Sequence, residues 1–295
     1  MTGTVYRGTM KMSVTGGGDV ADDIAEKAEQ ENFPVAARVL PARHRRQLLS
    51  VYCYARLVDD IGDDAPPRDR AALLDEVDAD LDRIDAGVPP RLPVLRALAP
   101  TVAACAIPVE PFRRLVTANR QDQTVTRYAT FADLLAYCEL SANPVGQIVL
   151  HVFGAATAER VGLSDKICSA LQIIEHCQDV GEDYDRGRVY LPEDDLRRFG
   201  CDETDIKEMI TPTRLRGVVA LEVTRAMRLL DEGTPLIAGL TGFAKIAVAG
   251  YVAGGRATVA ALERGRYDVL ARGLGPSKPR TAREWLRILT KTKAR

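Results

Sequence analysis

Four aspartates lie within residues 59–64 of the chain. Because residues three and four apart share a helix face, a helix here would carry one polar stripe within about 60° of arc. The stripe consists of Tyr52, Arg56, Asp59 and Asp63. The rest of the segment is apolar almost all round, as in a buried helix, where carboxylates need a metal ion or a cationic partner. An acidic turn at the end of an ordinary helix would explain the same residues.

A second acidic stretch covers residues 172–183. On one helix its polar residues share about 100° of arc, and they are Gln172, Glu175, His176, Asp179 and Asp183. The alternative is an amphipathic helix with its polar side in water. A solvated face usually mixes charges of both signs, whereas residues 167–185 contain no Lys or Arg. The pattern therefore favours a functional site.

Taken together, the two stretches predict a magnesium site. Acidic stripes about 120 residues apart can face each other across a helical bundle and hold Mg²⁺, which takes oxygen ligands and bridges carboxylates to substrate phosphates. The candidate ligands are Asp59, Asp60, Asp63, Asp179, Glu182 and Asp183. Arg70 occupies the twelfth position of the loop that starts at Asp59, which excludes an EF-hand, and no P-loop, G-x-G-x-x-G, H-E-x-x-H or G-x-S-x-G motif accompanies the clusters. The implied chemistry is ionisation of an allylic diphosphate in an apolar cavity.

The whole chain has 295 residues, with 40 Lys+Arg against 41 Asp+Glu, and 46% of its residues are hydrophobic. This composition is typical of a globular protein with a sizeable core. The lack of a basic surplus argues against a nucleic-acid partner. Six cysteines without a C-x-x-C pair indicate reduced thiols in a cytoplasmic protein. No stretch of about eighteen residues is apolar and uncharged, so no membrane span is predicted.

Helical periodicity predicts one all-α domain of roughly ten helices over residues 21–270. Proline and glycine breaks are expected at residues 65–67, 87–90, 107–108, 162–164, 190–192 and 211–212. Residues 1–20 are expected to be a disordered leader. The tail, residues 271–295, is basic and groups Trp285 with Leu286, Ile288 and Leu289, so it could lie on an anionic membrane.

Several motifs resemble those of the squalene/phytoene synthase family over residues 31–268. They are the two acidic stretches, Tyr137-Cys138 with the Ser-Ala-Asn-Pro-Val-Gly string of residues 141–146, and the Arg-Val-Tyr-Leu-Pro segment of residues 188–192. The resemblance implies an isoprenoid-synthase-type helical bundle around a central apolar cavity, with Mg²⁺ as cofactor. It implies catalytic roles for Tyr137 and Asp179, and substrate-binding roles for Tyr52, Arg56, Asn143, Arg188 and Tyr190. From their place on the second acidic stretch we also predict a catalytic role for Glu175 and a substrate-binding role for Gln172.

Within the family, some details are similar to the branch that acts on presqualene diphosphate. They are residues 31–35 (Glu-Asn-Phe-Pro-Val), residues 126–128 (Thr-Arg-Tyr), the string at 141–146, and Gln178 before Asp179. Squalene and phytoene synthases commonly have Ser-Arg-Ser-Phe at residues 30–33 and Arg-Asp at 178–179, so two diphosphate-binding cations are absent here. The resemblance implies ionisation of presqualene diphosphate, ring rearrangement and capture by water as hydroxysqualene, with no NADPH. Glu175 departs from the usual family Asn.

Three functions remain open from the sequence. The first is the hydrolytic conversion just described, with Glu175 or His176 positioning the water or adding to the metal shell. The second is head-to-head condensation of two farnesyl diphosphates to presqualene diphosphate, squalene or a carotenoid precursor. The third is a non-catalytic helical lipid- or metal-binding protein. Under the first, the expected partners are presqualene diphosphate, other enzymes of the hopanoid and squalene pathways, and the inner face of the cell membrane.

Overall fold

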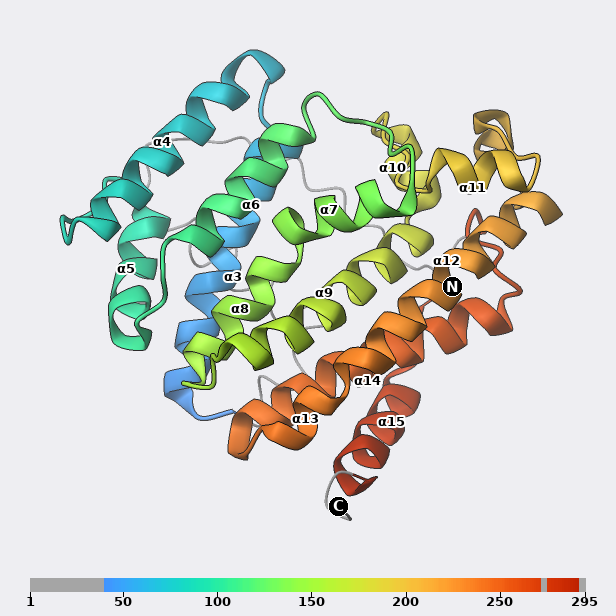
Figure 1. Cartoon of the computed structure of the whole chain (residues 1–295). Helices are drawn as coiled ribbons and strands as arrows, with labels where there is room; N and C mark the ends of the chain where they lie inside the picture. Colours follow the sequence, from blue (N-terminus) through green and yellow to red (C-terminus); the bar gives the residue numbers. More distant parts are fainter. Residues whose placement is uncertain (1–39, 272–274, 292–295) are drawn as a thin grey trace, which may run out of the picture.

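The computed structural model describes residues 40–271 and 275–291 of the chain (Figure 1). Within these ranges the chain forms thirteen α-helices and one 3-10 helix, and the β-type pairing is confined to a single bridge between Arg127 and Val189. The expected all-α fold is therefore confirmed. The proposed leader at residues 1–20 and the motif at residues 31–35 lie outside the described residues.

The helices follow one another with short connections. In chain order they are α3 (Ala42–Asp63), α4 (Pro67–Asp85), α5 (Pro93–Cys105), α6 (Glu110–Gln121), α7 (Phe131–Ser141), α8 (Asn143–Val152), α9 (Ala158–Gln178), α10 (Val180–Asp185), α11 (Glu193–Arg198), η1 (Glu203–Lys207), α12 (Thr213–Gly233), α13 (Pro235–Gly239), α14 (Gly242–Arg264) and α15 (Lys278–Lys291).

Five of the six predicted breaks separate helices, and the sixth is wrong. Gly162 lies inside α9, which begins at Ala158 after Thr157, whose side chain accepts a hydrogen bond from the Arg160 N–H at 3.3 Å. This cap fixes the start of the helix upstream of the glycine. A glycine inside a helix costs about 1 kcal/mol relative to alanine, which packing of the other face of α9 offsets.

Helix α9 is the central element of the bundle. Figure 1 shows it running alongside α8 on one side and α12 on the other, and it also packs against α14. Helix α14 approaches it closely because its residues are small: a Cβ on Gly255 would lie 2.5 Å from a methyl carbon of Leu171. The Ala- and Gly-rich composition of α14 is thus explained by close helix packing.

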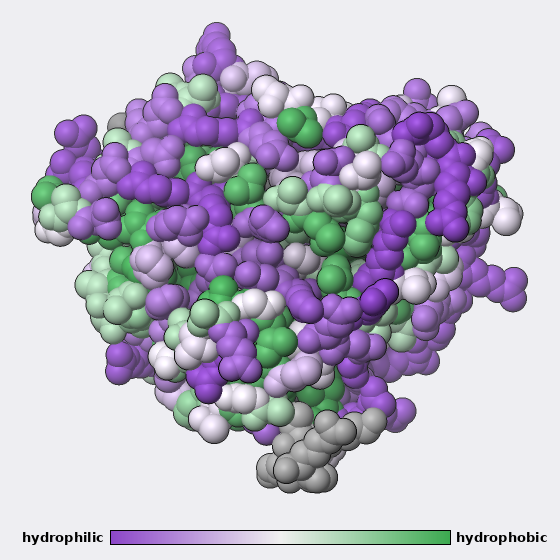
Figure 2. All heavy atoms as spheres, viewed as in Figure 1, coloured by the Kyte–Doolittle hydropathy of each residue, from purple (hydrophilic) through white to green (hydrophobic). Residues whose placement is uncertain are grey.

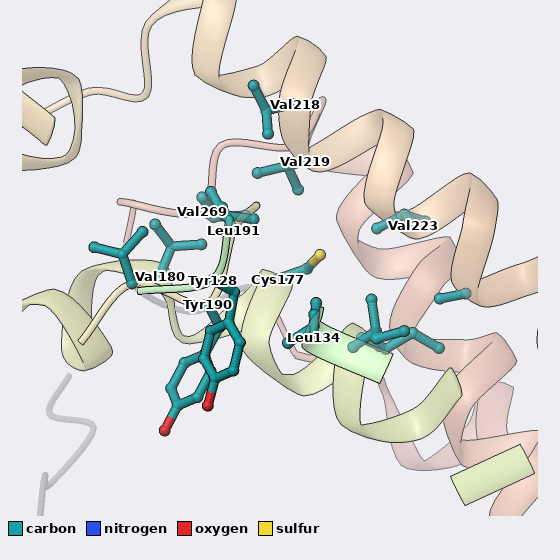
Figure 3. Close-up of a cluster of buried hydrophobic side chains, with 14 of the residues drawn as sticks. Tyr128, Leu134, Cys177, Val180, Tyr190, Leu191, Val218, Val219, Val223 and Val269 are labelled. Carbon is teal, nitrogen blue, oxygen red and sulfur yellow. The ribbon is translucent and has the colours of Figure 1, made fainter. Parts of the chain in front are cut away.

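Three clusters of buried apolar side chains form the core. One lies among α3 to α6 and α8, a second joins α8, α9 and α12 to α15, and a third joins α7, α9, α12 and the end of α14. Figure 3 shows part of the third, with the rings of Tyr128 and Tyr190 side by side and their hydroxyls directed away from Val218, Val219 and Val223. This cluster supports the segment that follows α10.

Helix α15 packs its apolar side against the protein. The Trp285 indole N–H donates to the Ile246 carbonyl at 3.0 Å, and Ile288 is buried with Leu289 beside it. The outer side carries exposed Lys278, Arg280, Arg283 and Leu286. The tail therefore uses most of its apolar face inside the fold and presents mainly cations to solvent.

The rest of the surface adds no second apolar face in the view of Figure 2, where hydrophilic residues dominate and hydrophobic ones form small separate patches. Among the described helices, none combines the length and apolar character that crossing a bilayer requires. All six cysteines are free thiols, as expected: Cys53, Cys105, Cys138, Cys168, Cys177 and Cys201.

Candidate active site

The first acidic stripe occupies the last turns of α3. Asn119 of α6 donates from Nδ2 to Asp59 Oδ1 at 3.2 Å. Helix α6 can come this close because residue 62 is glycine: a Cβ there would lie 2.0 Å from Asn119 Oδ1. The Asp59 side chain is exposed. Desolvation by the protein atoms around its carboxylate nevertheless raises its pKa to about 6; the Asn119 hydrogen bond opposes this rise and the charge of Asp63 adds to it. A cation beside Asp59 would stabilise its charged carboxylate.

Arg56 and Asp60 form an ion pair on the same helix, with Arg56 Nε 2.8 Å from Asp60 Oδ1. The i,i+4 spacing places the two groups on adjacent turns. Asp60 is therefore held by Arg56 rather than directed towards the second acidic stretch. Tyr52, one turn earlier, is partly buried on the same helix. The predicted stripe on α3 is thus present, with Asp60 lying to one side of it.

The second acidic stretch is not one continuous helix, which corrects the sequence prediction. Helix α9 ends at Gln178, Asp179 has φ −98° and ψ 16°, and α10 starts at Val180. Aspartate disfavours helix interiors, and the neighbouring carboxylates repel one another, so a break at Asp179 lowers the cost of this charge density. The pKa of Asp179 is raised to about 6 by burial first and then by the charges of Glu175, Asp183 and Glu182.

His176 nevertheless keeps contact with α10 across the break. Its Nδ1 lies 3.5 Å from Asp183 Oδ2, and its Nε2 lies 3.2 Å from Gln172 Nε2. The ring is buried and stacks on Tyr190, with centroids 3.7 Å apart. With both ring nitrogens occupied, His176 is placed to orient Asp183 and Tyr190. Glu175 is exposed, and it is the better placed of the two predicted residues to meet a water molecule.

Two arginines that follow the second acidic stretch contact the first. Arg188 Nη1 lies 2.8 Å from Asp63 Oδ1, and Arg186 Nη1 lies 3.6 Å from Asp63 Oδ2. Gly187 between them has φ +82°, a conformation that glycine adopts without strain and that lets both side chains reach one carboxylate. The sequence predicted that the two stretches face each other; the contact that the structure shows is between Asp63 of the first stretch and Arg188, which follows the second.

Asp122 is the main site residue that the sequence analysis missed. The Tyr137 hydroxyl donates to Asp122 Oδ2 at 2.7 Å, and the Tyr137 ring lies 5.5 Å from that of Tyr190. Burial raises the pKa of Asp122 to about 6, while the Tyr137 hydrogen bond and the charge of Arg188 oppose the rise. Asn119 was also missed. The two lie three residues apart on and just after α6, a helical spacing that could have indicated them.

Two other predicted residues make no side-chain contact with Asp122 or Tyr137. Asn143 is buried and accepts a hydrogen bond from Ser169 at 2.9 Å, which ties α8 to α9. Glu182 is exposed on α10. A surface hollow of about 290 Å³ also lies apart from the acidic residues, and its lining consists of Arg43, Arg46, Gln47, Ala97, Pro100 and Thr101.

The donor set suits magnesium, although over the described ranges no three acidic, His or Cys side chains form a ready-made metal site. Mg²⁺ usually takes one or two protein carboxylates and completes its shell with water and substrate phosphate. Asp59 and Asp179 both have pKa values raised by burial and by neighbouring carboxylates, so each would be stabilised by a nearby cation. These residues fit a cation that binds together with a diphosphate.

The family of the chain follows from comparison with known proteins. The family described as squalene/phytoene synthase matches residues 27–283. The chain belongs to the squalene/phytoene synthase family. Within that family, the hydroxysqualene synthase of Rhodopseudomonas palustris is 36% identical over 217 residues, 72% of either chain. The presqualene diphosphate synthase of the same organism is 31% identical over 198 residues, 66% of this chain and 70% of that one.

A solved family member has the same fold. The crystal structure of a squalene synthase from Alicyclobacillus acidocaldarius superposes with a TM-score of 0.78 at 39% identity, covering 88% of this chain and 98% of that one. As a squalene/phytoene synthase family protein, the chain is an enzyme of isoprenoid diphosphate chemistry.

Proposed function

We propose that this squalene/phytoene synthase family enzyme converts presqualene diphosphate to hydroxysqualene with Mg²⁺ and without NADPH. The observation that carries the proposal is the small number of cationic side chains at the site. Arg188 and Arg186 meet at Asp63, Arg56 is held by Asp60, and Gln178 contributes no charge before Asp179. This number of cationic side chains suits the binding of one diphosphate better than the binding of two. The similarity to a hydroxysqualene synthase at 36% identity supports the same choice.

In the proposed reaction, Arg188 and Arg186 bind the diphosphate and hold it in line with the carbon–oxygen bond that breaks. Asp59, Asp63 and Asp179 would hold Mg²⁺, which would neutralise the diphosphate and make it a better leaving group. The carbon skeleton rearranges to an allylic cation while the apolar helices exclude bulk water. One water then forms the new carbon–oxygen bond and releases a proton, so presqualene diphosphate and water give hydroxysqualene, diphosphate and a proton.

Tyr137, Tyr190 and Glu175 have distinct proposed roles. The rings of Tyr137 and Tyr190 lie together between α7 and the segment after α10, where an aromatic face stabilises a nearby carbocation. Exposed Glu175, one turn before Asp179, positions the attacking water. Glu175→Gln should then change the ratio of hydroxysqualene to squalene among the products. A variant that keeps both the rate and this ratio would remove Glu175 from the mechanism.

Product analysis tests the proposal directly. Purified protein with presqualene diphosphate and Mg²⁺ should form hydroxysqualene without NADPH, and chelation of the metal should stop the reaction. Farnesyl diphosphate alone should give no product. Formation of presqualene diphosphate or squalene from farnesyl diphosphate would instead favour the condensing reaction. The similarity to a presqualene diphosphate synthase supports that alternative.

The non-catalytic alternative has its own test. Asp59→Asn and Asp179→Asn should each abolish hydroxysqualene formation if the acidic stretches act as proposed. Cells that carry either variant and keep normal triterpene levels would favour a lipid- or metal-binding protein.

We also propose peripheral contact with anionic lipid through the outer face of α15. Lys278, Arg280 and Arg283 are exposed there, and Leu286 is 62% exposed. A cationic helix surface with an exposed apolar residue is attracted to anionic head groups. Because substrate and product are both apolar, binding at a bilayer would shorten their path to the site.

A further inference from the structure

Asp63 occupies the position where the diphosphate-binding arginines converge. Its two carboxylate oxygens face different guanidinium groups, Oδ1 that of Arg188 at 2.8 Å and Oδ2 that of Arg186 at 3.6 Å. The Arg188 side chain is only 12% exposed, so its charge is largely shielded from water and depends on Asp63 and on the charge of Asp122 nearby. One aspartate thus satisfies the two groups that the proposed function assigns to diphosphate.

The backbone holds Asp63 in this position. Asp63 is the last residue of α3, and its carbonyl oxygen accepts a hydrogen bond from Arg70 Nη2 at 2.8 Å. Arg70 also donates from Nε to the Ala65 carbonyl at 2.8 Å, so it fixes the turn that leaves α3. The carboxylate is therefore supported from its own helix, whereas Arg186 and Arg188 approach from the segment after α10.

We propose that Asp63 competes with diphosphate for Arg188 and Arg186, so that the site takes up a divalent cation and a diphosphate together and excludes a diphosphate without the cation. A carboxylate and a phosphate are alternative partners for one guanidinium group. A cation that binds the Asp63 carboxylate draws it from the arginines and leaves them for the diphosphate. The proposal rests on the proposed function for the identity of the anion, and it makes Asp63 a specificity-determining residue.

The test measures binding of inorganic pyrophosphate to the purified full-length protein in the presence of a chelator. Asp63→Asn should tighten pyrophosphate binding about tenfold, because it removes the competing charge. Asp64→Asn is the matched control: Asp64 is the next residue, it is exposed and forms no ion pair in the described part of the chain, and its substitution makes the same change of net charge. It should alter binding less than about twofold.

Added Mg²⁺ should reverse the order of pyrophosphate affinities, so that wild-type protein binds more tightly than Asp63→Asn. Wild-type protein should gain affinity for pyrophosphate, whereas Asp63→Asn should gain less, because it lacks one carboxylate for the cation. Equal effects of Asp63→Asn and Asp64→Asn without metal, or no binding by Asp63→Asn, would overturn the proposal. Turnover of presqualene diphosphate by the wild type tests the proposed function separately, so an active wild type with equal variants would refute only the competition.

A reciprocal variant keeps the test independent of the folding of Asp63→Asn. Arg188→Gln should bind Mn²⁺ more tightly than wild type without pyrophosphate, because Asp63 is released to the metal. Arg186→Gln, whose contact is longer and whose side chain is 58% exposed, should show a smaller gain in the same direction. Unchanged or weaker Mn²⁺ binding by Arg188→Gln would contradict competition at Asp63.

Discussion

The hydroxyl group of Tyr137 donates a 2.7 Å hydrogen bond to Oδ2 of Asp122. Oδ1 of the same carboxylate is buried and has no hydrogen-bond partner among the described residues. The Tyr137 ring also lies 5.5 Å from Tyr190 and 6.2 Å from His176. Asp122 therefore fixes the orientation of the tyrosine at the centre of an aromatic cluster, and under the proposed function we expect it to act on the reaction through Tyr137.

Removal of this carboxylate should impair turnover more than substrate binding. Asp122→Ala should lower kcat about 10- to 100-fold with little change in KM, as expected when the partner that orients an active-site group is lost. Asp122→Asn keeps an acceptor oxygen and should restore most of the rate. Tyr137→Phe should lose a similar factor, and the double variant should be no worse than either single one. Multiplicative losses in the double variant would show that the two residues act independently.

Gly62 provides a test of the packing that places Asn119 beside Asp59. A Cβ at residue 62 would lie 2.0 Å from Asn119 Oδ1, so Gly62→Ala should destabilise the fold by about 1 to 3 kcal/mol and disturb the Asp59 contact. Gly162→Ala is the control, since a Cβ there would meet no atom within 4 Å inside α9. That change should be neutral or stabilise by up to about 1 kcal/mol. Thermal unfolding of the two variants measures the difference. Equal stability of Gly62→Ala and Gly162→Ala would show that the close approach of α6 does not require glycine at residue 62.

Features that depend on local sequence were predictable. The stripe on α3 follows from residue spacing alone, and Pro144 fits in the first turn of α8 because its missing N–H is tolerated there. The break at Asp179 was not predictable from the same arithmetic. A helical wheel assumes an unbroken helix. Here the repulsion among four neighbouring carboxylates disfavours a continuous helix.

Pairings between distant segments were beyond the sequence. Asn119 and Asp59 are 60 residues apart, and their contact exists only because α6 crosses α3 at Gly62. Arg188 was predicted to hold diphosphate, but nothing in the spacing indicated that Asp63 would be its partner. The packing of the tail also depends on a distant segment. The composition around Trp285 suggested a helix on a membrane surface, whereas the contact with α14 determines where the apolar side of α15 lies.

Glu222 should make stability depend on pH. Its side chain is 1% exposed, Oε1 accepts a hydrogen bond from Arg225 at 2.7 Å, and burial raises its pKa to about 7. The folded state therefore holds the proton more tightly than the unfolded chain, whose pKa is 4.5. The stability that this proton contributes is fully present below pH about 4.5 and is lost as pH rises through about 7.

The variant Glu222→Gln should remove this dependence. At pH 5 it should match wild type closely, and at pH 8 it should be more stable by up to about 3 kcal/mol. Thermal unfolding at the two pH values measures the difference. Glu263→Gln, the same change at an exposed position of α14, should follow wild type at both. A Glu222→Gln variant that is destabilised equally at pH 5 and pH 8 would show that the ion pair with Arg225 outweighs the burial of the charge.

The cationic outer face of α15 should govern binding to anionic vesicles. Each basic side chain near an anionic surface contributes about 1 kcal/mol, so replacement of Lys278, Arg280 and Arg283 by Gln should lower partition about 100-fold. Trp285 is left intact, and α15 should stay docked through its bond to the Ile246 carbonyl. Vesicle sedimentation at about 0.1 M salt measures the effect, and vesicles of neutral lipid should bind both proteins equally weakly.

The matched control neutralises three exposed arginines of other helices, Arg43, Arg46 and Arg68. If attraction comes from α15, this control should retain most of its binding, because charges more than about 10 Å from the lipid surface are screened at 0.1 M salt. Leu286→Ser should cause a further, salt-independent loss, since an inserted apolar side chain contributes by burial in the head-group region. Equal losses in the two triple variants would assign the binding to overall charge and remove α15 as the contact.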